Sequence, residues 1–166
     1  TSVSEGKNLN NKIINFDIEE KPTGEISAGA GFGSSGGTVM FGLKENNYLG
    51  RGINVNANAT VSSETFKGLL SVSNPNYKNS DKTVFASFQA LETDKLKSYG
   101  YKTNKTGFEL GTKFEYLEDF NFGLSSSSFY EKIETGSNAS ARQKSQEGDY
   151  LDIFTNLEFN YDKRNQ

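Results

Sequence analysis

The sequence predicts an all-β protein in which about eight antiparallel meander strands form part of a transmembrane β-barrel. Apolar and polar residues alternate with a period of two in successive segments, turn residues recur at short intervals, and helical periodicity is absent. Only 33% of the 166 residues are hydrophobic and mean hydropathy is -0.67, yet 13% are aromatic. Disordered chains are usually poor in aromatic residues. A membrane barrel with a polar interior, an apolar exterior and aromatic girdles fits this composition.

The amino-terminal part is expected to be separate from the barrel. Residues 1–11 are polar and are expected to be irregular, and residues 12–20 form a strand with Ile14, Phe16 and Ile18 on one face. Lys21 and Pro22 then interrupt it, because proline has no N–H to donate and restricts the residue before it. No apolar signal-peptide segment is present in the first twelve residues, so a signal was removed or the chain is an excerpt.

The first barrel strand, residues 24–33, has an unusual composition. Ile26, Ala28, Ala30 and Phe32 fall on one face, and the other face carries little more than glycine and Ser27. Each glycine costs ordering entropy and contributes no packing, so this strand is expected to be weakly held by its neighbour. A second strand, residues 37–47, follows a tight turn and repeats the alternation with Val39, Phe41 and Leu43.

The remaining strands are expected to show the same one-sided pattern. We place them at about 51–62, 65–74, 82–93, 101–116, 120–134 and 149–162. In the third strand Ile53, Val55 and Ala57 alternate with asparagines, which require water or each other as hydrogen-bond partners. A water-filled lumen satisfies that requirement, as does the solvated face of a soluble sheet.

The connections fall into two sets, one at each end of the strands, when the strands are numbered up and down. The first set is residues 46–52, 74–81, 116–120 and 161–166, and the second is residues 34–37, 62–65, 92–100 and 134–148. The second set contains the two most polar long loops, which is typical of the external loops of outer-membrane barrels. Two aromatic girdles are expected, one at each end of the strands. Near the first set of turns lie Tyr48, Tyr77, Tyr116, Phe120 and Tyr161, and near the second lie Tyr99, Tyr101, Phe129, Tyr130 and Tyr150. The alternative is that aromatic residues are simply common in strands.

The composition also argues against several functions. With a net charge of -3 and no basic stripe, nucleic-acid binding is not expected. The absence of cysteine and histidine removes disulfides and the usual nucleophiles, bases and transition-metal ligands. The carboxylates of Asp149, Asp152 and Glu158 follow no known metal-loop spacing. We therefore expect no catalytic residue, no metal site and no cofactor.

Three segments, in their order and spacing, resemble the amino-terminal half of the barrel of the BamA family of outer-membrane assembly factors. One is the glycine-rich first strand. The others are two turn motifs, formed by Asn47, Tyr48, Leu49, Gly50, Arg51 and Gly52 and by Ser73, Asn74, Pro75, Asn76 and Tyr77. Residues 13–20 resemble the last strand of the final periplasmic POTRA module, and residues 161–164 resemble the periplasmic turn after the eighth strand.

The resemblance implies a sixteen-stranded, surface-antigen type barrel behind POTRA modules. Residues 1–21 would end the last module, and residues 22–166 would form half of the barrel in a bacterial outer membrane. The whole would insert unfolded outer-membrane clients with the help of accessory lipoproteins. Client strands would add to the exposed edge of the first strand, the lateral gate. The implied gate residues are Gly24, Glu25, Ile26, Ser27, Ala28, Gly29, Ala30, Gly31, Phe32 and Gly33.

Other interpretations stay open at this point. The strand glycines could only relieve barrel curvature. The segment around Arg51 could hold an anion, although an interfacial cation in a tight turn is favoured. The whole chain could be a complete eight-stranded outer-membrane barrel with a structural or adhesion role, a small-barrel enzyme, or a soluble β-sandwich binding module.

Overall fold

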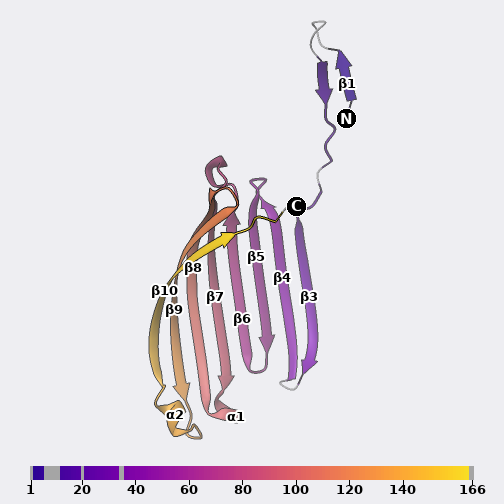
Figure 1. The fold of residues 1–166 in the computed structure, drawn as a ribbon. Helices are drawn as coiled ribbons and strands as arrows, with labels where there is room; N and C mark the ends of the chain where they lie inside the picture. The colour runs from indigo at the N-terminus through magenta and orange to yellow at the C-terminus, as the bar shows by residue number, and fades with distance from the viewer. Residues whose placement is uncertain (1, 6–11, 20, 34–35, 165–166) are drawn as a thin grey trace.

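The fold is an open antiparallel meander of eight strands preceded by a separate two-stranded hairpin (Figure 1). The computed structural model describes residues 2–5, 12–19, 21–33 and 36–164. Within these ranges no helix is long and apolar enough to cross a membrane. Parts of the predicted lead-in, the first turn at Ser34 and Ser35, and residues 165–166 lie outside the described residues.

The strands of the large sheet match the sequence prediction closely. They pair in chain order, each with the next, so the sheet is an uninterrupted meander. Their bounds are β3 (Gly24–Gly33), β4 (Gly36–Tyr48), β5 (Ile53–Ser62), β6 (Thr65–Asn74), β7 (Thr83–Lys95), β8 (Tyr101–Leu117), β9 (Phe120–Thr135) and β10 (Gly148–Tyr161). β3 and β10 are the two edges, and among the described residues they do not pair with each other. The closed eight-stranded barrel is therefore not the observed arrangement.

The amino-terminal hairpin differs from the prediction. β1 (Ser2–Glu5) pairs with β2 (Lys12–Asn15), so part of the expected irregular lead-in is a strand. The expected strand over residues 12–20 ends at Asn15, since β1 provides partners only as far as that residue. Phe16 and Ile18 continue the apolar alternation without a neighbouring strand and are 67% and 84% exposed. A connection without regular structure then leads through Pro22 to the large sheet (Figure 1).

The pairing register gives the large sheet one apolar and one polar face. Directly paired residues share a face, as Val55 does with Val72 and Asn56 with Ser71. The face containing Ile26, Leu43, Val55, Leu110 and Leu157 is called the apolar face below. The face containing Ser27, Asn58, Ser71, Lys105 and Glu158 is called the polar face.

No other element of the described residues covers the apolar face. Among the described residues no hydrophobic side chain is buried, and Ile26 and Ile153 are 69% and 68% exposed. Charges on this face are confined to its two ends. Near the helical loops lie Glu92, Asp94, Lys102, Lys132, Glu134 and Asp149, and Glu45 lies at the opposite end. The uncharged zone between them is a band of the kind that a barrel presents to lipid.

One of the two predicted aromatic girdles is confirmed by the register at three of its five residues, and the other is largely wrong. At the turn end, Tyr48, Phe120 and Tyr161 lie on the apolar face, where Phe122 contacts Phe114 and Phe159 with ring centroids 5.5 and 5.4 Å apart. At the loop end, Tyr101, Phe129 and Tyr150 lie on the polar face, and only Tyr130 of that set is on the apolar face. Position along a strand indicated the right end, but the period of two placed these rings on the other side.

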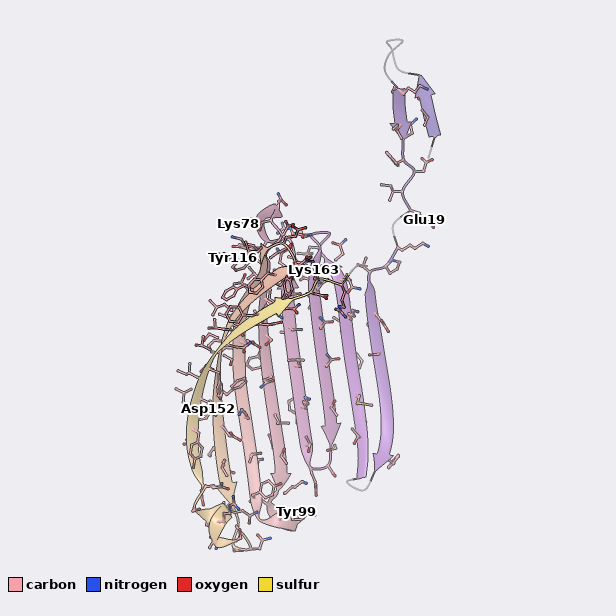
Figure 2. The ribbon with its side chains drawn as sticks, viewed as in Figure 1. Glu19, Lys78, Tyr99, Tyr116, Asp152 and Lys163 are labelled. Atoms are coloured by element: carbon pink, nitrogen blue, oxygen red, sulfur yellow. The ribbon has the colours of Figure 1, made fainter. Side chains whose placement is uncertain are left out.

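The loops at that end are built by two short helices. α1 (Leu96–Tyr99) follows β7, and α2 (Ala141–Lys144) lies in the long connection before β10, with a capping box between Ser140 and Gln143. Gln143 Nε2 donates to Tyr99 O at 3.2 Å, and Asn138 Nδ2 donates to Lys97 O at 3.3 Å. Tyr99 therefore marks the loop end of the sheet, whereas Lys78 and Tyr116 mark the turn end (Figure 2).

Glycines on the polar face of β8 and β9 create room for large neighbours. A Cβ atom on Gly111 would lie 2.3 Å from Phe85 Cζ, and one on Gly107 would lie 2.1 Å from Phe129 Cδ1. Gly123 separates Lys113 from Glu158, whose Nζ and Oε2 atoms are 2.6 Å apart. Lys105 similarly pairs with Glu131 at 3.6 Å and with Asp152 at 3.9 Å. On the polar face, aromatic rings thus pack against the backbone of glycine residues, and charged side chains form ion pairs.

This packing predicts a position-dependent cost for filling a glycine. Gly111→Val should destabilise the protein by about 1–3 kcal/mol, because the Phe85 ring has to move. Gly31→Val is the matched control, since nothing lies within 4 Å of its Cβ position. Urea unfolding in detergent micelles compares the two variants. Equal transition midpoints would show that Gly111 is not required by the ring.

Candidate functional site

The candidate site is the free edge of β3, the strand whose residues 24–33 the sequence singled out. β3 pairs with β4 from Gly24 opposite Glu45 to Gly33 opposite Gly36. Its other side has no partner strand among the described residues, so backbone N–H and C=O groups line an open edge (Figure 1). Glu25 is the only charged residue in the strand. The edge therefore lacks the lysine, proline or bulge with which soluble sheets block further pairing.

The glycines on the polar face of β3 are not required by this fold. Gly31 and Gly33 have nothing within 4 Å of a Cβ position, and Gly29 has only Met40 Cε at 3.5 Å. None of these three is among the glycines with positive φ. By contrast, a Cβ on Gly42 in β4 would lie 2.6 Å from Ser27 Oγ. Within the described residues, neither steric crowding nor backbone conformation explains Gly29, Gly31 and Gly33.

The bare backbone forms a shallow depression beside the edge. Its volume is about 370 Å³, and it is lined mainly by Ser27, Gly29, Met40, Gly42, Asn58 and Thr60. The hydroxyl and amide groups there belong to the polar face. On the apolar face Phe32 is 95% exposed, with its ring edge close to Gly37. The loop end of β3 is consequently held by little besides its pairing with β4.

A polar clamp fixes the other end of β3. Thr23 Oγ1 and the Asn47 N–H both donate to Glu45 Oε1, the latter at 2.7 Å, and Asn46 Nδ2 donates to Thr23 O at 3.2 Å. A Cβ on Gly24 would come within 2.7 Å of Glu45 Oε2, so this glycine is required. Glu45 lies directly opposite Gly24 in the β3–β4 pairing, which places its carboxylate beside the start of β3. We call Thr23, Glu45 and Asn46 the β3 clamp.

Sequence reasoning missed this clamp. The available signal was Glu45 itself, a carboxylate that continues the apolar alternation of Val39, Phe41 and Leu43. Its partner Thr23 is 22 positions away in sequence, and the contact depends on the β3–β4 register.

The first turn motif holds its shape through Asn47. The side-chain oxygen of Asn47 accepts a hydrogen bond from Gly52 N at 2.6 Å, and its carbonyl accepts one from Gly50 N at 3.0 Å. Leu49, Gly50 and Gly52 have φ values of 57°, 70° and 64°, so the two glycines occupy conformations that suit them. Arg51 forms no ion pair with any described residue. Its role as an interfacial cation stays a prediction.

The second motif forms a wider turn at the same end of the sheet (Figure 2). Asn74 Oδ1 accepts from Asn76 N at 3.1 Å, and Pro75 follows directly after β6 ends. Tyr77 N donates to Lys82 O at 3.0 Å and closes the turn. The terminal segment also turns here, and hydrogen bonds from Arg164 to the Asp162 carboxylate lower the pKa of Asp162.

The described part of the chain contains no cluster of three or more acidic, histidine or cysteine side chains that could hold a metal ion. The candidate site thus consists of the open β3 edge, two hydrogen-bonded turns and the β3 clamp at its base.

Two comparisons with known proteins relate this arrangement to others. The model of the Omp85 superfamily domain matches residues 47–166. Among solved structures, the fold is similar to the crystal structure of BamA from Haemophilus ducreyi lacking POTRA domains 1–3, with a TM-score of 0.60 and 22% sequence identity. That match covers 90% of this chain and 32% of the other, so the chain corresponds to about a third of the chain in that structure.

The clamp makes a testable prediction about local motion. Glu45→Ala should increase amide hydrogen exchange at residues 24–27 toward the rate of residues 29–33, because Thr23 and Asn47 lose their shared acceptor. Glu45→Gln retains an acceptor and should have a smaller effect. Lys44→Gln, one residue away on the polar face, is the control. Unchanged exchange in Glu45→Ala would contradict the clamp.

Proposed function

This chain belongs to the Omp85 superfamily, and we propose that it forms part of a machine that inserts β-barrel proteins into the bacterial outer membrane. In this proposal residues 22–166 are the amino-terminal half of a larger barrel whose apolar face contacts the outer-membrane bilayer. The open edges of β3 and β10 support a larger barrel, since each of these strands pairs on one side only within the described chain. Its substrates would be unfolded outer-membrane proteins, and its partners would include accessory lipoproteins.

We further propose that residues 1–21 end the last periplasmic POTRA module, of which this chain contains no more than the β1–β2 hairpin. The hairpin pairs only within itself among the described residues, and Pro22 lies in the connection to the large sheet. The family match begins at residue 47 and thus lies entirely within the large sheet. If the hairpin is periplasmic, the two turn motifs at the end of the sheet nearest to it face the periplasm (Figure 1).

The mechanism we propose is strand addition at the edge of β3. An extended client strand would hydrogen-bond to the free backbone groups, which provides affinity with little dependence on side-chain sequence. The observation that supports this most strongly is the group of Gly29, Gly31 and Gly33, which neither crowding nor positive φ explains. Such glycines keep the strand deformable and its register permissive. The β3 clamp would hold the turn end while the Phe32 end separates and re-pairs.

Crosslinking tests strand addition directly. The chain contains no cysteine, so a cysteine at Ser27 or Gly31 introduces one defined reactive position into this segment. With a stalled client that carries a cysteine in its last strand, we expect disulfide crosslinks along residues 24–33 of the intact protein. Cysteines at Asn56 or Asn58 in the interior strand β5 are the controls. Crosslinking no stronger than at these controls would rule out the edge as the binding strand.

The glycine argument predicts a separation of stability from activity. Gly29→Val and Gly31→Val together should leave the fold intact, because the added side chains meet open space or the flexible end of Met40. They should slow client insertion about fivefold, or roughly 1 kcal/mol, by stiffening β3 and holding it on β4. Thr38→Val, directly opposite Gly31, is the isosteric control. Normal insertion rates in the double variant would show that the glycines are not used in opening.

A further inference from the structure

A crevice opens on the apolar face next to the second turn motif. It has a volume of about 390 Å³, and its lining includes side chains from β5, β6, β7 and β8 together with Tyr77 from the turn. Val72, Ala86 and Leu110 form one row of paired residues across three strands. Asn74 and Val84 form the next row toward the turn end. Ala86 is the smallest member of its row, so the surface is hollowed between two larger neighbours.

The wide turn forms the wall of the crevice at the turn end of the sheet. Tyr77 is anchored by its N–H bond to Lys82 O, and its own carbonyl accepts from Ser80 Oγ at 2.6 Å. Its side chain is 41% exposed and lines the crevice. Lys78 and Asn79 have φ values of 55° and 58°, a conformation that costs free energy for residues other than glycine. The turn thus maintains an unfavourable backbone conformation directly beside the crevice.

Two ammonium groups lie on the turn side of the crevice, one over the ring of Tyr77, which lines it, and one over the ring of Phe114. Lys82 precedes Val84 by two positions and so continues the apolar face, with Nζ 5.6 Å from the ring centroid of Phe114. Lys78 Nζ is 5.4 Å from the ring centroid of Tyr77. Neither lysine forms an ion pair with a carboxylate in the described parts of the chain. Both charges are therefore available to an external anion.

The opposite end of the apolar face offers a direct contrast. There, Lys102 Nζ lies 2.6 Å from Glu92 Oε1, and Lys132 Nζ lies 2.6 Å from Glu134 Oε1. Those lysines are neutralised within the sheet, and four carboxylates share their surface. Among the described lysines of the apolar face, the one without an ion pair is Lys82, at the turn end beside the crevice.

We propose that this crevice, together with Lys78 and Lys82, binds one phospholipid with an anionic headgroup. The acyl chain lies against Val72, Ala86 and Leu110, and the phosphate is held by Lys78 and Lys82. A volume of about 390 Å³ falls in the range of small-molecule sites, about 300–1,000 Å³. Basic residues beside a membrane-facing surface attract anionic lipids. The assignment rests on the proposed membrane placement and does not require that the protein insert clients.

Native mass spectrometry of the intact, delipidated protein in detergent tests the site. The probes are phosphatidylglycerol and phosphatidylcholine with identical acyl chains. We expect one phosphatidylglycerol to be retained with about tenfold preference over phosphatidylcholine, and Lys78→Gln with Lys82→Gln to abolish that preference. Ala86→Phe, which fills the crevice, should weaken both lipids. Lys97→Gln at the loop end is the matched charge control and should change neither.

The results that overturn the proposal are distinct. An unchanged preference in the double lysine variant, or an equal loss in Lys97→Gln, excludes the headgroup site. Unchanged affinity in Ala86→Phe excludes the acyl site, and Ala86→Leu replaces this variant if it fails the heat-dependent gel-mobility test for a folded barrel. A separate insertion assay keeps the two proposals apart. Lipid binding without insertion would count against the proposed function only, and insertion without lipid preference would count against this site only.

Discussion

The uncovered apolar face is the constraint on which the rest of this structure depends. An antiparallel sheet in water has to bury one face against another layer, yet here the described residues contain no buried hydrophobic side chain. Ile26, Ile153 and Phe159 are all more than half exposed, so no described part of the chain covers them. A bilayer supplies the missing layer, and membership of the Omp85 superfamily agrees with this environment. The confinement of charge to the two ends of the face and the aromatic cluster near Phe122 follow from the same constraint.

Within that constraint, glycine has two different roles. Gly107 and Gly111 lie under the rings of Phe129 and Phe85, and Gly24 makes room for the Glu45 carboxylate, so these residues are part of the packing. Gly31 and Gly33 face open space, with nothing within 4 Å of a Cβ position. Ion pairs of Lys105 and Lys113 connect β8, β9 and β10 across the polar face, whereas the polar contacts of β3 are concentrated in the clamp at its base.

The sequence was sufficient for the strands and insufficient for contacts that depend on register. Strand bounds agree to within about two residues because alternation and turn residues are local signals. The prediction that Tyr101, Phe129 and Tyr150 belong to a lipid-facing girdle was wrong, because one step along a strand reverses the face on which a side chain lies. The pairing of Ser2–Glu5 with Lys12–Asn15 was missed because its residues are mostly polar. The β3 clamp and the crevice near Tyr77 required distant segments to be placed together. The resemblance to the BamA family found the edge strand but not these features.

Accessibility along β10 tests the central claim most directly. Single cysteines at Leu151, Ile153 and Leu157 lie on the apolar face, and cysteines at Asp152, Phe154 and Asn156 lie on the polar face. In the intact protein, reconstituted into lipid vesicles, a water-soluble thiol reagent should modify the second set rapidly and the first set slowly. A quencher within the lipid should affect only probes attached at the first set. Equal labelling of both sets, or protection that does not alternate, would contradict a bilayer against the apolar face.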